Sequence, residues 1–128
     1  MTNKIKILAV DDEAFNLDIM CEYLETGGYE AISADDGDTA LQKLEEHSDI
    51  AVVVLDRMMP RMNGMDVIKK MQADPRFCNI PVVMQTAAAT QTQMMEGVQA
   101  GVYAYISKPY EDHELLSMIS NALVLFKK

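Results

Sequence analysis

The sequence predicts an α/β fold built as a doubly wound, five-stranded parallel sheet with five helices. Short apolar runs alternate five times with segments of helical period along the 128 residues. The run at residues 50–55 is apolar on both faces, which is typical of the centre of a parallel sheet. Right-handed βαβ crossovers would join such units into one sheet. We expect residues 1–128 to form a single domain that contains no separate output domain.

The first half of the chain begins with an apolar run at residues 5–10, the first expected strand. A helix follows and ends at Gly27-Gly28, and a modest second strand occupies residues 29–34. Apolar residues at helical spacing mark the second helix, and the valine-rich run at 50–55 is the third strand. The faces of the two helices are marked by Ala14, Leu17, Cys21 and Leu24 and by Ala40, Leu41 and Leu44.

The third helix and the fourth strand come next. Asn63-Gly64 begins the helix, which carries apolar residues at 65, 67, 68 and 71, and Asp74-Pro75 stops it. The fourth strand is expected at residues 80–85, with Pro81 near its start, where a proline is tolerated.

The last two helices enclose the fifth strand, at residues 103–107. Thr90 is the expected N-cap of the fourth helix, with Gln93 three residues on, and Gly101 is a candidate left-handed C-cap. At this length the common strand order is 2-1-3-4-5, the flavodoxin-like arrangement. The fifth helix carries Leu115, Leu116, Ile119, Ala122, Leu123 and Phe126.

The net charge of −9 is placed unevenly along the chain. Residues 1–56 hold 14 Asp and Glu against 3 Lys and Arg, whereas residues 57–128 hold 6 against 8. Nucleic acid is bound by clustered lysine and arginine, so this balance argues against direct nucleic-acid binding. No apolar stretch approaches the 18 residues of a membrane span, and the first residues lack a signal-peptide layout. We expect a cytoplasmic domain without membrane contact.

Polar residues stand where four of the expected strands end. Asp11 and Asp12 follow the first strand, Asp56 the third, Thr86 the fourth and Lys108 the fifth. Parallel strands present their carboxyl ends along one edge, where ligands bind, so these side chains should converge. Three carboxylates repel one another unless they are neutralised, and one Mg²⁺ together with the lysine brings the sum near zero.

This set of residues favours metal-assisted phosphoryl transfer, which needs positioning and charge neutralisation more than a general base. Asp56 stands alone at its strand end and is the better nucleophile, whereas the adjacent acids are the better metal ligands. Lys108 can hold a phosphoryl oxygen as a point charge, and Thr86 can donate to another. The pair Asp11-Asp12 alone could simply cap the following helix. However, four separate strand ends each carry a residue suited to phosphoryl transfer, and this coincidence favours a phosphoryl-transfer site.

The pattern resembles the receiver domain of two-component response regulators, of the kind found in chemotaxis regulators, over nearly the whole chain. The residues that carry the resemblance are Val10-Asp11-Asp12-Glu13, Gly28-Tyr29, Gly37 with Ala40-Leu41, Leu55-Asp56 with Met59-Pro60, Gly64, Thr86-Ala87, Tyr105 and Lys108-Pro109-Tyr110. Each mark is weak by itself, and in this order they are highly specific. The resemblance implies a phosphorylation-controlled signalling module and not a metabolic enzyme.

The resemblance implies that Asp56 accepts a phosphoryl group from a histidine kinase or a histidine phosphotransfer protein. It implies Mg²⁺ (or Mn²⁺) as the cofactor, bound by Asp56, by Asp12 directly, by Asp11 through water and by the Met58 backbone carbonyl. Thr86 and Tyr105 would form the switch that changes the face made by the fourth helix, the fifth strand and the fifth helix. That face would contact a downstream protein, and Lys108-Pro109 would be joined by a cis peptide bond.

Three residues depart from the family pattern. Met58 and Ala88, two residues after Asp56 and Thr86, offer no polar side chain to orient a hydrolytic water, so we expect slow loss of phosphate. Gln85 is polar where the strand is usually apolar. Residues 123–126 are apolar over a wide arc, so they either contact a second copy, as in a phosphorylation-dependent dimer, or continue into a longer protein.

Other functions fit the sequence less well. A magnesium-dependent aspartyl phosphatase usually has a general acid two residues after its nucleophile, where Met58 stands. A flavodoxin-type FMN binder needs a phosphate loop after the first strand, and Asp11-Asp12-Glu13 would repel phosphate. A pseudo-receiver that has lost the chemistry would lack a required side chain, and none is missing.

Overall fold

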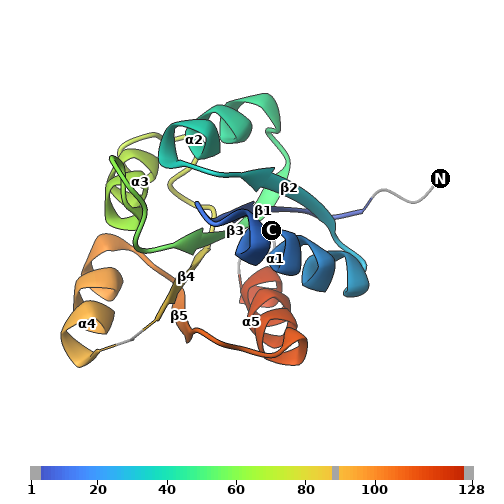
Figure 1. The fold of residues 1–128 in the computed structure, drawn as a ribbon. Helices are drawn as coiled ribbons and strands as arrows, with labels where there is room; N and C mark the ends of the chain where they lie inside the picture. Colours follow the sequence, from blue (N-terminus) through green and yellow to red (C-terminus); the bar gives the residue numbers. More distant parts are fainter. Residues whose placement is uncertain (1–3, 88–89, 126–128) are drawn as a thin grey trace.

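The computed structural model describes residues 4–87 and 90–125, which form one five-stranded parallel sheet between two layers of helices (Figure 1). The strand order is β2-β1-β3-β4-β5, so the predicted fold class and strand order are confirmed. The strands are β1 (Lys6–Val10), β2 (Glu30–Ala34), β3 (Ile50–Asp56), β4 (Val82–Thr86) and β5 (Ala104–Ser107).

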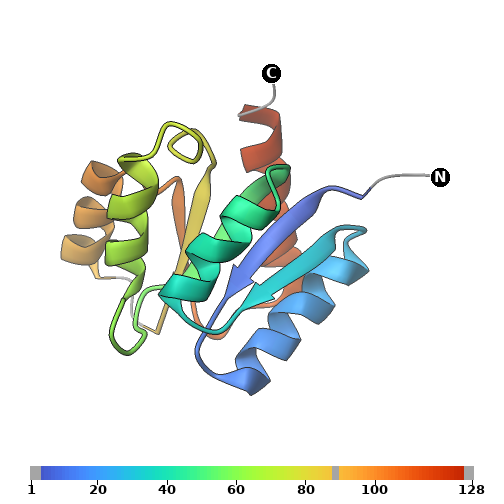
Figure 2. The same ribbon diagram turned by 90° about the horizontal axis from the view of Figure 1, so that it is seen from above.

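Five helices cover the two faces of the sheet. Helices α1 and α5 lie together on one face, and α2, α3 and α4 lie on the other (Figures 1 and 2). This division is the doubly wound arrangement that right-handed crossovers produce when the chain starts at an inner strand and turns back. The helices are α1 (Ala14–Thr26), α2 (Gly37–Glu46), α3 (Gly64–Gln72), α4 (Gln91–Ala100) and α5 (Asp112–Leu125).

Strand β3 is the centre of the apolar core. Its side chains alternate between the two helical layers, with Val53 and Leu55 on the α2–α3 side and Val52 and Val54 on the α1–α5 side. All four are fully buried, as predicted for a strand with an apolar residue on both faces. Because the core fixes β3 from both sides, the residue that ends it, Asp56, is held on a rigid element.

The predicted ends of the helices are largely confirmed. The Asn63 side chain accepts from the Asp66 N–H, and the Asp66 side chain accepts from the Asn63 N–H, a complete capping box at the start of α3. The Thr90 hydroxyl accepts from the Gln93 N–H at the start of α4. Helix α4 ends at Gly101, whose φ of 100° lies in the left-handed region that glycine adopts without steric cost.

The structure differs from the sequence prediction in two elements. Ala14 was expected on the buried face of α1 but is exposed, because it is the first residue of the helix; Met20 and Leu24 are the buried residues. Strand β4 starts at Val82, because Pro81 has no N–H to donate and contributes only its carbonyl, which accepts from Val53 N–H at 3.1 Å.

The last turns of α5 leave apolar side chains in contact with solvent. Leu123 is half-buried, whereas Val124 and Leu125 are 73% and 68% exposed. Phe126, the last member of the predicted apolar set, lies outside the described residues. The apolar arc at the end of α5 is therefore wider than the surface that packs on the sheet.

Candidate functional site

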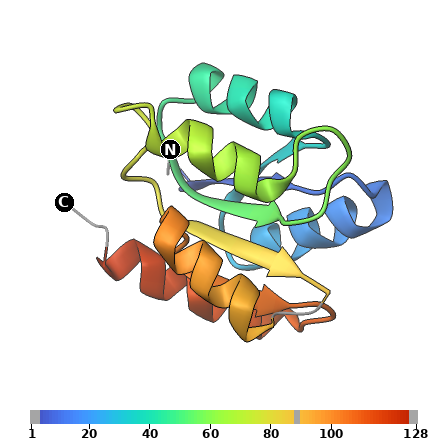
Figure 3. The same ribbon diagram turned by 90° about the vertical axis from the view of Figure 1, so that its left-hand side faces the viewer.

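The carboxyl ends of β1, β3 and β5 bring the predicted charged residues together, at the end to which the strand arrowheads point in Figure 3. The ammonium of Lys108 joins two of them: its Nζ lies 3.3 Å from Asp11 Oδ2 and 3.2 Å from Asp56 Oδ1. Asp11 and Asp56 are almost completely buried, and the lysine side chain is 23% exposed. The predicted convergence of these strand ends is confirmed.

Asp12 completes a cluster of three carboxylates. One oxygen each from Asp11, Asp12 and Asp56 lies within 4.8 Å of the others, with Asp12 on the solvent side. Carboxylate oxygens at one end of a sheet, open on one side to water, suit a hard divalent cation that keeps several water ligands. The donor set of this site therefore fits the cation expected from the sequence.

The electrostatics of Asp56 follow from its surroundings. Burial and the neighbouring Asp11 raise the pKa of Asp56 to about 6, although Lys108 opposes this rise. Burial alone would lower the pKa of Lys108, but the two carboxylates outweigh that effect and raise it. The lysine is thus charged at neutral pH, and Asp56 is ionised there with an unusually high affinity for a proton.

Backbone groups and β4 complete the wall of the site. The Met58 backbone N–H donates to Asp56 and stabilises its ionised form, while the Met58 side chain is 70% exposed. Thr86 ends β4, is 4% exposed, and pairs with Ser107 of β5. Its carbonyl accepts from the Lys108 N–H at 2.8 Å, which ties the lysine to β4. The Lys108-Pro109 peptide is cis, as predicted, and Ala88 lies outside the described residues.

Gln85, for which the sequence offered no explanation, lies inside the site. Its Nε2 donates to Asp11 Oδ2 at 2.9 Å, and its Oε1 accepts from the Tyr110 hydroxyl at 2.7 Å. The signal in the sequence was a polar residue in a buried strand. Its partners could not be predicted, because Asp11 is 74 positions away in the chain.

Arg57 is a second residue that the sequence did not indicate. Its guanidinium donates to the Tyr105 hydroxyl at 3.0 Å and pairs with Glu96 of α4 at 3.3 Å. The Tyr105 hydroxyl in turn donates to the Gln93 carbonyl at 2.8 Å. The residue next to Asp56 in sequence is therefore linked to the predicted switch tyrosine and to α4.

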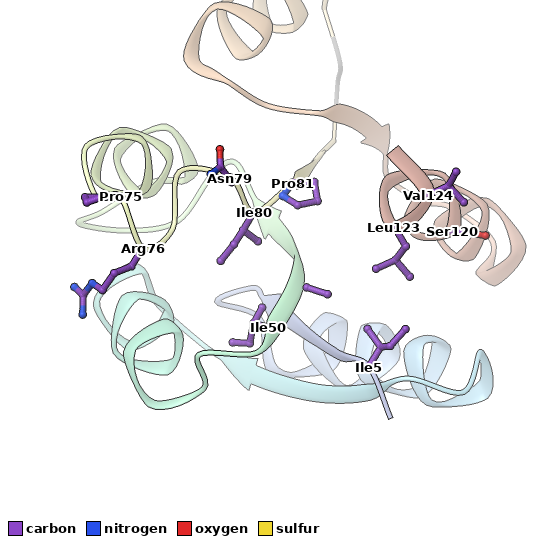
Figure 4. A pocket seen from close by; sticks show the side chains of 11 residues that line it. Ile5, Ile50, Pro75, Arg76, Asn79, Ile80, Pro81, Ser120, Leu123 and Val124 are labelled. Carbon is purple, nitrogen blue, oxygen red and sulfur yellow. The ribbon is translucent and has the colours of Figure 1, made fainter. Parts of the chain in front are cut away.

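Figure 4 shows an apolar pocket of about 610 Å³. Its lining residues at the starts of three strands place it at the opposite end of the sheet from the carboxylates. Ile5, Ile50 and Pro81, at the starts of β1, β3 and β4, line it together with Leu123 and Val124 of α5. Its lining contains the Ser120 hydroxyl and the Arg76 side chain but no carboxylate, and it shares no residue with the cluster described above.

The sequence model of the response regulator receiver domain matches residues 7–120. The chain belongs to the response regulator receiver domain family. Receiver domains are signalling modules of two-component systems that are phosphorylated on an aspartate, and they are not metabolic enzymes. In the described part of this receiver domain, no helix is long and apolar enough to cross a membrane.

Similar proteins include a chemotaxis protein that this chain nearly spans and a longer transcriptional regulator that it spans by about half. This receiver domain is 38% identical over 107 residues to chemotaxis protein CheY1 of Helicobacter pylori, covering 83% of this chain and 86% of that protein. It is 36% identical to transcriptional regulatory protein CpxR of Escherichia coli, covering 89% of this chain and 47% of CpxR. The solved structure of Vibrio cholerae chemotaxis protein CheY4 superposes with a TM-score of 0.89 at 28% identity, covering 94% of this chain and all of that one.

Proposed function

We propose that Asp56 accepts a phosphoryl group from a histidine kinase or a histidine phosphotransfer protein, with Mg²⁺ (or Mn²⁺) as the cofactor. The observation that carries this proposal is the position of Lys108, whose Nζ lies within 3.3 Å of both Asp11 and Asp56 at the open carboxylate cluster. Phosphoryl transfer requires a nucleophile, metal ligands and a fixed positive charge, and this edge of the sheet can supply all three.

In the transfer, a carboxylate oxygen of Asp56 forms a bond to phosphorus while the phosphorus–nitrogen bond of the donor phosphohistidine breaks. The electron pair of that bond stays on the imidazole nitrogen, and Asp56 becomes an acyl phosphate. Asp11, Asp12, Asp56 and the Met58 backbone carbonyl would hold the cation, which would neutralise charge on the phosphoryl oxygens. Lys108 would donate to one of these oxygens, and the Thr86 hydroxyl to another.

The switch that we propose uses Thr86 and Tyr105 to change the face formed by α4, β5 and α5. Phosphorylation adds close to two negative charges and strong acceptor oxygens, so contacts made in only one conformation shift an existing equilibrium. The contacts of Arg57 with the Tyr105 hydroxyl and with Glu96 support this route, because they join the residue after Asp56 to α4.

A downstream protein would contact this face. Three apolar side chains of α4, Met94, Met95 and Val98, are 45%, 59% and 70% exposed. Methionine adapts its shape to different partners, which suits a surface that is remodelled on phosphorylation.

The donor would approach over the exposed apolar side chains near the carboxylates, Phe15 at 75% exposure and Met58 at 70%. Phe15→Ala should therefore slow phosphorylation by a protein donor and leave phosphorylation by acetyl phosphate unchanged. Equal rates with the protein donor for this variant and the wild type would contradict this docking position. As for response regulators generally, we place the domain in the cytoplasm, without direct contact with nucleic acid or membrane.

Slow loss of phosphate follows from Met58 and Ala88, because neither side chain can orient an attacking water. Met58→Asn introduces an amide that can do so and should shorten the lifetime of the phosphorylated form. A half-life of seconds for the purified wild type in Mg²⁺ would contradict this expectation.

The exposed end of α5 supports a phosphorylation-dependent dimer as a further part of the proposal, since Val124 and Leu125 offer apolar area to a second copy. Light scattering with and without an acyl-phosphate mimic tests it, and an unchanged monomer would rule it out.

The central experiment is incubation with acetyl phosphate or phosphoramidate and Mg²⁺, followed by intact-mass measurement. We expect the wild type to gain one phosphoryl group and Asp56→Asn to gain none. No gain by the wild type would refute the proposal. Continuous turnover of an aryl phosphate would instead support a phosphatase.

A further inference from the structure

Gln85 places a polar amide in a fully buried strand of the sheet. The residue is 1% exposed and belongs to β4, whose other residues are also buried. Its neighbours across the sheet are Asp56 in β3 and Ile106 in β5. Burying an amide is costly unless its donors and acceptor are satisfied, so the contacts of Gln85 require an explanation.

The chemistry of its partners fixes the orientation of this amide. The Asp11 carboxylate can only accept when it is ionised, so the side-chain NH₂ of Gln85 must face it, at 2.9 Å. The amide oxygen then faces the Tyr110 hydroxyl, which must donate, at 2.7 Å. A second contact of the NH₂ group is the Met20 sulfur, 3.1 Å from Nε2. The three groups therefore form a directed chain, Tyr110 to Gln85 to Asp11.

Tyr110 is itself held in place. It lies two residues after Lys108, in the loop between β5 and α5, and its ring packs edge-on against Tyr23 of α1 with centroids 6.2 Å apart. Burial raises the pKa of Tyr110, so its hydroxyl stays protonated and remains a donor. The loop that carries Lys108 is thus connected to Asp11 twice, by the ammonium and by the Tyr110–Gln85 pair.

Both oxygens of Asp11 are engaged in this way. Oδ1 accepts from the Glu13 N–H at 2.9 Å, while Oδ2 accepts from Gln85 and from Lys108 at 3.3 Å. Asp11 has no exposed surface, so water cannot replace a lost donor from the solvent side. These contacts fix the rotamer of the carboxylate before any cation arrives, and outer hydrogen bonds of this kind orient metal ligands.

We propose that Gln85 and Tyr110 act as one unit that positions the Asp11 carboxylate for the divalent cation and couples that carboxylate to the loop of Lys108. This inference rests on the proposed function, because it assumes that Asp11 is a cation ligand. It assigns the two residues to positioning and not to catalysis, since Gln85 acts through Asp11 and Tyr110 acts through Gln85.

The experiment is a Mg²⁺ titration of ¹⁵N-labelled protein without a phosphodonor, on the wild type, Gln85→Leu, Tyr110→Phe and the double variant. Gln85→Leu should raise the dissociation constant for Mg²⁺ about tenfold or more, the usual effect of removing such a hydrogen bond. Tyr110→Phe should change it in the same direction and by less. The double variant should be no weaker than Gln85→Leu, because the two residues act through one contact.

Tyr23→Phe is the matched control. It removes a phenol hydroxyl from the same aromatic pair but leaves the chain from Tyr110 to Asp11 intact, so Mg²⁺ affinity should be unchanged. A second readout needs no cation: the Glu13 amide, which donates to Asp11, should exchange with solvent faster in Gln85→Leu and Tyr110→Phe. If Gln85→Leu fails to fold, Tyr110→Phe, which removes a single oxygen, still decides both readouts.

Mg²⁺ affinities within twofold of the wild type in both single variants would overturn the inference, and so would additive losses in the double variant. If the wild type itself bound no Mg²⁺, the proposed function would fail. In that case solvent exchange of the Glu13 amide would separately show whether Gln85 and Tyr110 hold the Asp11 carboxylate in place. Exchange rates equal to those of the wild type in the variants would refute this positioning role.

Discussion

Replacing Asp56 by asparagine should stabilise the protein in the absence of metal. The ionised Asp56 carboxylate destabilises the folded state, because it is buried and lies beside the negative charge of Asp11. Burial and Asp11 raise the pKa of Asp56 from 3.8 to about 6. Between these pH values the folded protein binds more protons than the unfolded chain, so stability falls as the pH rises through this window. Above about pH 6 Asp56 is ionised in both the folded and the unfolded protein, so the full loss of stability is present. At about 1.4 kcal/mol per pKa unit, a rise of about two units corresponds to roughly 3 kcal/mol.

Urea unfolding followed by circular dichroism in EDTA checks this prediction. At pH 7.5 Asp56→Asn should be more stable than the wild type by on the order of 2 to 3 kcal/mol, and the difference should disappear below about pH 4. Saturating Mg²⁺ should reduce the difference, because a cation at 100 times its dissociation constant stabilises the wild type by about 2.7 kcal/mol.

Asp49→Asn is the control for this experiment. Asp49 is an exposed carboxylate beside Lys6, whose hydrogen bond holds the pKa of Asp49 below its usual value, so this substitution should bring no gain. A destabilised Asp56→Asn at pH 7.5, or a gain of the same size at pH 4, would refute the electrostatic reasoning.

Three further predictions concern α4 and its link to the site. Arg57→Met removes the donor to the Tyr105 hydroxyl and the ion-pair partner of Glu96, so the amides of α4 should exchange with solvent faster. The control is Arg61→Met, which changes an exposed arginine and should leave the exchange of these amides unchanged. Gly97→Ala would place a Cβ in steric overlap with the Tyr105 ring. It should therefore lower stability by about 1–3 kcal/mol in urea unfolding instead of giving the usual gain of alanine in a helix. Thr90→Ala removes the N-cap of α4 and should cost about 1 kcal/mol in the same assay, and an unchanged midpoint would show that the cap contributes nothing.

The sequence alone was sufficient for the fold class, the strand order and the residues at the strand ends. These features depend on local patterns: an apolar run of five or six residues, a helical period, and a polar residue where a run stops. Asp56 could be chosen as the nucleophile because parallel strands end along one edge, which is a rule of the topology and needs no coordinates. The capping of α3 and α4 was predictable for the same reason, since each cap bonds within three residues.

The tertiary structure decided which polar groups meet and how far each is buried. Gln85 contacts Asp11 across 74 positions and Arg57 contacts Tyr105 across 48, and no local pattern links such residues. Their pairing depends on which strands are neighbours, on the rotamers that the core allows, and on the cost of leaving a buried polar atom without a partner. The sequence therefore determined the groups that we propose for the chemistry, whereas packing determined the direction of their pKa shifts and the contacts that position them.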